Sequence, residues 1–241
     1  VSNTDYIINL AGAGIADKPW SAEYKQEIIN SRILITQALA NAINRAEKKP
    51  SAFISASAVG YYGSRGDEIL PETASNGTGF LADVCRQWEA AAKIAGESTR
   101  LINGRIGIVL DKKSGALPKM LAPFKFFSGS VLGSGKQWMP WIHITDLVNL
   151  FCYCLDNQNL RGPVNLTAPA PVTNKDFTKA IGRVVEKPVI FKAPSLALKL
   201  MLGESADMVL GSQRAIPNAA TEAGFEYIFT DVETALENLI G

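Results

Sequence analysis

Short apolar runs alternate with longer helical patterns in the first half of the chain. Residues 4–12, 52–57 and 101–110 predict strands, and the first of them, which ends in glycine, suits burial on both faces of a parallel sheet. Residues 21–46 and 80–95 repeat apolar positions at helical spacing, and Ser21 can cap the first of these helices. This order of strands and helices predicts a doubly wound α/β fold with a Rossmann-like parallel sheet.

The second half of the chain has shorter elements. Residues 129–135 are expected to be a loop, Thr145 is expected to cap a helix, and residues 188–241 have the broken pattern of a small appendage. We therefore expect a Rossmann-like domain over residues 1–160 and a small mixed α/β region on the substrate side over residues 161–241. The other expected elements are helices at 116–126, 146–155 and 173–185, an extended segment at 138–144 and a strand at 163–166.

Composition excludes several classes of function. Lys and Arg number 24 against 23 Asp and Glu, so the net charge of +1 offers no basic surface for nucleic acid. The chain is 47% hydrophobic but has no apolar run long enough to span a membrane, as in a soluble globular protein. Three cysteines without a CxxC pair and a single histidine predict no metal site and a reducing, cytoplasmic location.

Two glycine-rich stretches resemble phosphate-binding motifs without matching them. Residues 12–17 begin like a dinucleotide fingerprint, but Asp17 stands at the third glycine position and no helix opens before Ser21. Residues 129–137 are one residue too long for a P-loop, and Gln137 replaces its magnesium-binding Ser or Thr. Neither stretch is predicted to hold phosphate.

Small and hydrogen-bonding residues lie instead at the ends of three predicted strands, at 9–12, 57–63 and 105–110. Ligands of open α/β sheets bind beyond these carboxyl ends. These segments resemble the extended short-chain dehydrogenase/reductase superfamily, and more narrowly its atypical nucleoside-diphosphate-sugar epimerase-like branch, also labelled SulA-type cell-division inhibitor. The resemblance rests on residues 8–12, 20–32, 55–63, 80–85, 88–89, 133–138, 141–144, 202–204, 211–214 and 222–225.

The resemblance carries an expectation about the cofactor. It implies that NAD(P) is the cofactor, with NADP(H) favoured over NAD and the choice between them left open. It also implies that about 50–60 residues with the phosphate-binding glycines precede Val1. The N-terminal strands of the fold are then missing from this chain, which by itself would complete no cofactor site.

The usual acid/base pair of the superfamily is absent. Relatives place a Tyr and a Lys four residues apart on one helix, where the ammonium lowers the pKa of the phenol. Here the register could pair Phe80 with Val84, Leu81 with Cys85, or Ala82 with Arg86, and none of these is a Tyr and a Lys.

The resemblance also assigns roles to single residues. Ser57 would hydrogen-bond a substrate hydroxyl, unless the register moves that role to Ala58. Tyr62 would contact the nicotinamide or donate a proton. His143 is the side chain with an ordinary pKa near neutrality, which makes it a third catalytic candidate. The expected cofactor-binding residues are Asn9, Leu10, Ala11, Gly12, Ser55, Ala56, Arg105, Gly107 and Val109.

Aromatic and cationic side chains are the candidates for substrate binding. Trp138 and Trp141 could stack on a base or sugar, and Lys119 and Arg214 could hold a diphosphate. Tyr61 joins them on the substrate side. Arg105 lies in a predicted strand, where a buried cation needs a carboxylate or carbonyl partner.

Two functions remain open at this point. The first is an NAD(P)-dependent nucleotide-sugar epimerase or oxidoreductase that acts by reversible hydride transfer. The alternative is an NADP(H)-binding regulatory or interaction protein, linked to cell division, without catalysis. By analogy with relatives, the helices at 21–46 and 80–95 would form a homodimer interface.

Overall fold

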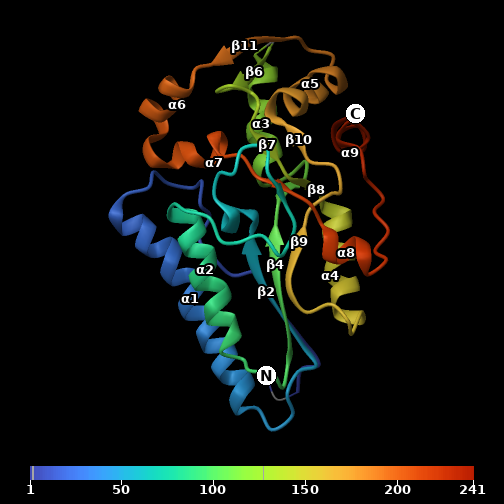
Figure 1. Ribbon diagram of the computed structural model, residues 1–241. Coiled ribbons are helices and arrows are strands. Elements are labelled where there is room, and N and C mark those ends of the chain that lie inside the picture. The colour runs from blue at the N-terminus through green and yellow to red at the C-terminus, as the bar shows by residue number, and fades with distance from the viewer. Residues whose placement is uncertain (2, 127) are drawn as a thin grey trace.

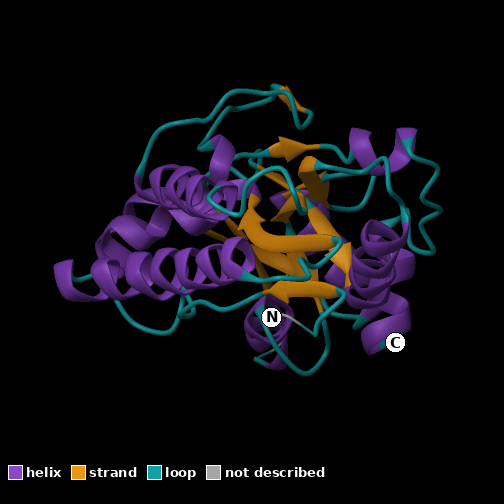
Figure 2. Ribbon diagram, turned by 90° about the horizontal axis from the view of Figure 1, so that it is seen from below, coloured by secondary structure: helices purple, strands orange, loops and turns teal. Residues whose placement is uncertain are grey.

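A four-stranded parallel sheet forms the centre of the protein, with the strand order β1-β2-β4-β9. The computed structural model describes residues 1, 3–126 and 128–241. Helices α1 and α2 cover one face of the sheet, and α4 and α8 cover the other (Figures 1 and 2). The predicted doubly wound α/β fold is therefore confirmed. The strands are β1 (Tyr6–Asn9), β2 (Ala52–Ala58), β4 (Arg100–Ile106) and β9 (Gly162–Leu166), and the helices are α1 (Ala22–Arg45), α2 (Phe80–Lys93), α4 (Ile144–Asp156) and α8 (Asn218–Glu222).

Alternating side chains of the strands feed two separate cores. In β2, Phe53 packs with Ile43 of α1 and Ala92 of α2, whereas the next residue, Ile54, packs with Leu150 of α4. This alternation follows from the two-residue period of a strand. Because both faces are covered, β2 is buried along almost its whole length.

The edge strand β1 differs from the prediction. Tyr6 and Ile8 are 40% and 42% exposed, and only Asn9 in this strand is buried. The expected burial on both faces was wrong for the described part of the chain, because Ile7 packs against the core shared with α1 and α2 whereas Tyr6 and Ile8 point to the opposite face and join none of the described core clusters.

The predicted cap of the first helix is present, and further hydrogen bonds tie this helix to the sheet. The Ser21 hydroxyl caps α1 by accepting the backbone N–H of Tyr24 at 3.2 Å. Farther along α1, the buried Thr36 hydroxyl lies 2.9 Å from Asn9 Nδ2 and 2.9 Å from Trp88 Nε1. One threonine thus ties together the end of β1 and both helices of this face.

The single strand predicted at 101–110 is two strands. β4 ends at Ile106, and β5 (Ile108–Leu110) leaves the central sheet to pair with β8 (Trp141–His143). Gly107 makes the change possible, because a Cβ there would lie 2.5 Å from the carbonyl oxygen of Pro140.

Two further local predictions were wrong. Residues 129–135 are not simply a loop, since β6 (Gly129–Leu132) pairs in parallel with β11 (Val189–Ala193). The cap of α4 is His143, whose Nδ1 accepts the N–H of Thr145 at 3.0 Å. Both depend on partners or geometry that a local pattern does not encode.

Above the sheet, α5 and α9 enclose a second core with Phe177, Leu236 and Trp141 (Figure 1). No helix in the described part of the chain is both long and apolar enough to cross a membrane.

The remaining elements are η1 (Val59–Tyr62), β3 (Ile69–Leu70), α3 (Ala116–Lys125), β7 (Trp138–Met139), β10 (Val172–Thr173), α5 (Asn174–Val184), α6 (Ser195–Leu202), η2 (Gly203–Ala206), α7 (Asp207–Leu210), β12 (Arg214–Ala215) and α9 (Val232–Ile240).

Candidate functional site

The carboxyl ends of the four parallel strands meet at one edge of the sheet, which makes this edge the candidate site. Asn9, Ala58, Ile106 and Leu166 are the last residues of the strands. Beyond them lie the turn after β1, the 3-10 helix η1 and the C-terminal elements α6, η2 and α7 (Figure 1).

The turn after β1 is exposed and narrow. Leu10 is 58% exposed, and the following N–H of Ala11 bonds to Asn9 Oδ1 at 3.2 Å. From α1, Arg32 Nη1 donates to the carbonyl of Ala13 at 3.0 Å, and a Cβ on Gly12 would lie 3.0 Å from Arg32 Cζ. A side chain at position 12 would therefore have to displace the end of Arg32, and the exposed turn fits a flat ligand lying against the backbone.

Asn9 acts from beneath this turn. It is 4% exposed, its Nδ2 bonds to Thr36 and its Oδ1 to Ala11 N–H. Of the cofactor-binding residues predicted after β1, Leu10, Ala11 and Gly12 are thus accessible, and Asn9 orders their backbone.

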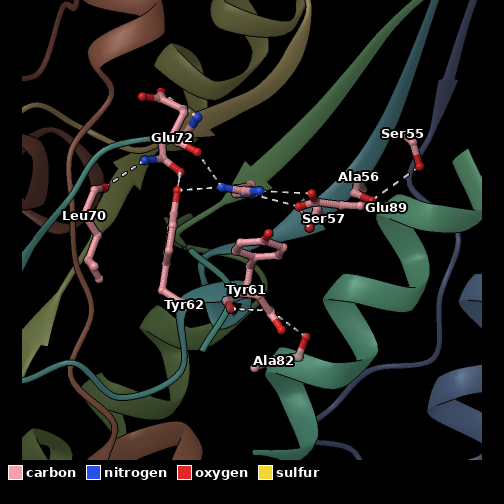
Figure 3. A network of polar contacts seen from close by, with 12 residues as sticks. Ser55, Ala56, Ser57, Tyr61, Tyr62, Leu70, Glu72, Ala82 and Glu89 are labelled. Carbon is pink, nitrogen blue, oxygen red and sulfur yellow. Dashed lines mark hydrogen bonds and ion pairs between the residues drawn. The ribbon is translucent and has the colours of Figure 1, made fainter. Parts of the chain in front are cut away.

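Below the edge, Arg105 of β4 forms a buried ion pair with Glu89 of α2. Arg105 Nε and Nη2 donate to the two carboxylate oxygens at 2.8 and 3.0 Å, and the side chains are only 3% and 8% exposed. Ser57 donates to the same carboxylate at 2.8 Å (Figure 3). The carboxylate partner expected for a buried Arg105 is thus present.

Tyr62 belongs to the same network. Its hydroxyl donates to Asn165 Oδ1 at 2.7 Å and accepts from Arg105 Nη1 at 3.0 Å. Glu72 Oε1 accepts the backbone N–H of Asn165 at 3.0 Å, and its own carbonyl accepts from Arg105 (Figure 3). Burial raises the pKa values of Tyr62 and Glu72, although Arg105 opposes both shifts.

This burial argues against the three predicted catalytic residues as direct partners of a ligand. Ser57, Tyr62 and His143 are 2%, 0% and 2% exposed. The hydroxyls of Ser57 and Tyr62 are held by protein groups. The ring of His143 stacks on Phe229 at 3.9 Å, its Nδ1 caps α4, and burial lowers its pKa. These side chains hold elements of the fold together.

Several predicted cofactor contacts also lie inside the protein. Ser55 is fully buried, Ala56 and Arg105 are 3% exposed, and the N–H of Gly107 bonds to Leu166. Val109 is half-buried in β5, outside the central sheet. Their positions argue for structural roles.

The predicted substrate-binding residues divide into two groups. Trp141 is fully buried and its Nε1 donates to Ala170 O at 2.9 Å. Trp138 is half-buried, holds Asp67 through its Nε1 at 2.8 Å and carries the guanidinium of Arg214 over its ring at 4.2 Å. The structure thus brings Trp138 and Arg214 together but separates Trp141 from them.

The other two substrate candidates lie elsewhere. Lys119 of α3 is exposed, and its Nζ donates to the carbonyl of Ala16 in the loop before α1 at 3.3 Å. The half-buried ring of Tyr61 lies 3.5 Å from Arg105 Cζ. Tyr61 therefore stacks on the buried network, whereas Lys119 stays accessible to a ligand.

A cluster that the sequence did not reveal lies at the same edge. Phe80, the first residue of α2, meets Trp20 edge-on at 5.0 Å between ring centres. Lys25 of α1 places its ammonium 5.2 Å from the centre of the Phe80 ring and forms an ion pair with Glu204 of η2. Helical spacing could place Lys25 near the start of α1, but nothing local joins it to a residue so distant in the chain.

No group of three or more His, Cys, Asp or Glu side chains able to hold a metal ion occurs among residues 1, 3–126 and 128–241. The three cysteines are free thiols, and burial raises the pKa of Cys85 to about 11, so this thiol is not a ready nucleophile.

Comparison with known proteins shows the family. Residues 1–166 match the NAD dependent epimerase/dehydratase family, and residues 193–239 match a domain of unknown function, DUF1731. The chain belongs to the NAD dependent epimerase/dehydratase family. Two relatives support this over nearly the whole chain. A chloroplastic SDR39U1 homolog of Arabidopsis thaliana is 41% identical over 100% of this chain and 70% of its own length. The epimerase family protein ML0860 of Mycobacterium leprae is 42% identical over 98% of this chain and 77% of its own length.

Solved structures of this epimerase family agree with the fold. The human epimerase family protein SDR39U1, crystallised with NADPH, matches with a TM-score of 0.95 and 32% identity over 99% of this chain and 82% of that one. A UDP-glucuronic acid 4-epimerase mutant from Bacillus cereus matches with a TM-score of 0.78 over 99% of this chain and 74% of that one, but at 15% identity it shows the shared fold alone.

Proposed function

We propose that this epimerase-family protein is an NAD(P)-dependent epimerase or oxidoreductase that works without the usual Tyr and Lys pair. It would exchange a hydride with a carbon of a nucleotide-sugar-like substrate. The observation that carries the proposal is the match over 99% of the chain to a relative crystallised with NADPH, which favours NADP(H) as the cofactor. When bound, the nicotinamide would supply the hydride acceptor or donor.

The carboxyl edge of the sheet fits such a cofactor. Leu10, Ala11 and Gly12 would hold it, because their turn is exposed and Gly12 carries no side chain between the backbone and a ligand. Asn9 and Arg32 keep this turn in place through Ala11 N–H and Ala13 O. These contacts order the backbone before a ligand arrives, which reduces the entropy lost on binding.

The substrate would bind on the side of the C-terminal elements. Arg214 is the proposed partner of a diphosphate, because a guanidinium can grip phosphate oxygens with two bonds. Its position over Trp138 leaves an aromatic surface beside the charge. Lys119 is a second proposed cation, already held near the turn by Ala16 O.

The test mixes the full-length protein with NADP⁺ and one of two substrates. UDP-glucose is used in one assay and UDP-glucuronic acid in the other. Absorbance in the reduced-nicotinamide band is expected to rise as the substrate is oxidised on the enzyme, and turnover is expected to survive both Tyr62→Phe and His143→Ala because both side chains are buried. Tight NADPH binding without any hydride transfer would instead favour the alternative, a cofactor-binding regulatory or interaction protein.

The proposed location of the protein is the cytoplasm.

The proposed partner is a second copy of the chain. Helices α1 and α2 lie side by side, and Leu34 and Ile35 of α1 are 58% and 41% exposed. Burying such side chains between copies would be favourable. Light scattering of the full-length protein is expected to give a dimer mass, which Leu34→Asp shifts to that of a monomer; a monomeric wild type contradicts this interface.

A further inference from the structure

Hydride transfer to a carbonyl carbon needs a proton donor for the carbonyl oxygen, and the three catalytic candidates predicted from the sequence are buried. Ser57, Tyr62 and His143 are each 2% exposed or less. A general acid must come within hydrogen-bonding reach of the substrate oxygen. A titratable group that is accessible at the carboxyl edge is therefore required.

We propose that Lys25 is the catalytic acid and base of this site, with Glu204 as the residue that positions it. The proposal rests on the hydride-transfer function proposed above. Two contacts hold Lys25, the ion pair with Glu204 and the Phe80 ring beneath its ammonium, and the Phe80 ring is itself packed edge-on against Trp20. Lys25 lies in the first turn of α1 and Phe80 begins α2, so both come from the side of the sheet where β1 and β2 end, and Glu204 reaches them from η2.

The geometry of the aromatic ring supports this role. A cation over an aromatic face is held by the ring quadrupole, which restricts where the ammonium can lie. The ammonium of Lys25 lies 5.2 Å from the centre of the Phe80 ring, within the range of this attraction.

Exposure also suits a group that exchanges protons. The Lys25 side chain is 25% exposed and that of Glu204 is 66% exposed, so the pair is sheltered on one side and open to water on the other. Glu204 orients the ammonium without burying it. In contrast, the Arg105–Glu89 pair is closed to water and cannot renew a proton from solvent.

The proposed step balances. The carbonyl oxygen of the substrate would take a proton from the Lys25 ammonium as its carbon takes the hydride that a bound NADPH would supply, so that a carbonyl becomes a hydroxyl and NADPH becomes NADP⁺. Lys25 is left as a neutral amine and regains a proton from water. In the reverse direction the neutral amine accepts the hydroxyl proton as the hydride leaves the carbon.

The decisive variants are Lys25→Met and Lys25→Arg in the full-length protein, with UDP-glucose and UDP-glucuronic acid as substrates. Lys25→Met is expected to slow hydride transfer by about 10²-fold or more. Lys25→Arg keeps the charge but should not restore the rate, because a guanidinium does not release its proton. Added ethylamine is expected to rescue Lys25→Ala partly. The matched control is Lys18→Met, since Lys18 is 61% exposed and pairs with Glu27 nearby.

A second readout does not depend on turnover. Limited acetylation followed by peptide mass spectrometry is expected to show slower acetylation of Lys25 when NADPH is bound, whereas the acetylation rate of Lys18 should not change. In Glu204→Gln this protection of Lys25 should be smaller, because the ammonium is no longer held in place. Equal acetylation of Lys25 with and without NADPH overturns its place in the site. An active wild type with an equally active Lys25→Met overturns the catalytic role alone, whereas an inactive wild type overturns the proposed function and this role with it.

Discussion

Glu89→Gln is expected to lower the free energy of unfolding by about 3–5 kcal/mol, because it leaves the buried guanidinium of Arg105 without its counter-charge. Burial alone would lower the pKa of Arg105, but the hydrogen bonds and charge of Glu89 more than offset this and raise it, so the guanidinium stays charged. The amide group of Gln also turns one acceptor into a donor facing Arg105 and leaves fewer acceptors for Ser57. Urea unfolding at neutral pH, followed by circular dichroism, measures the change.

The exposed pair of Arg65 and Glu68 provides the matched control. Its side chains are 27% and 48% exposed, so Glu68→Gln should cost about 1 kcal/mol or less. The double variant Glu89→Leu with Arg105→Met is expected to recover much of the lost stability, since it removes both buried charges together. A Glu89→Gln protein as stable as the Glu68→Gln protein contradicts the importance of the pair.

Trp141→Ala is expected to cost about 3–5 kcal/mol of stability, because it empties a large volume in a closed core. Trp141 is fully buried against Phe177 and Leu236 and bonds to Ala170 O. The loss should appear as a lower midpoint of urea unfolding. A change in the KM for a sugar nucleotide without a loss of stability would show instead that this tryptophan contacts substrate.

Trp138 is the natural comparison because it has the same side chain in a half-buried place. Trp138→Ala removes a ring that carries Arg214 and holds Asp67, and it should cost about 1 kcal/mol of stability. Its main effect is expected on the KM for UDP-glucose or UDP-glucuronic acid, which stopped-flow measurements at several substrate concentrations would reveal. An unchanged KM contradicts the substrate role proposed for the Trp138 and Arg214 surface.

Local patterns were enough to predict the main helices and the central strands. The cap at Ser21 and the apolar spacing behind it depend on residues close in sequence, and α1 begins and ends where they predict. In the same way, the run at 52–57 is a strand because its apolar residues serve two cores. The wrong boundaries occur where a distant partner decides, as when β11 pairs with residues predicted to be a loop.

The candidate site shows the same division. The exposed turn at Leu10–Gly12 was predicted from its place after a strand, and it remains the proposed cofactor contact. The motif residues Ser57 and Tyr62 were identified as site candidates, yet their hydroxyls are held by Glu89, Asn165 and Arg105. The spacing of motifs in the sequence predicts which residues lie near the carboxyl edge of the sheet. It does not predict whether their polar atoms face a ligand or the core.

By itself, the sequence determined the fold class, the family resemblance and the absence of a Tyr and Lys pair, because these depend on local patterns and motif identity. Only the tertiary structure decided which polar groups are accessible. It buried Tyr62 and Trp141 and brought Lys25 to Glu204, a residue far away in the chain. The physical reason is that burial and ion pairing depend on which distant segments pack together, and that packing is fixed by the whole core.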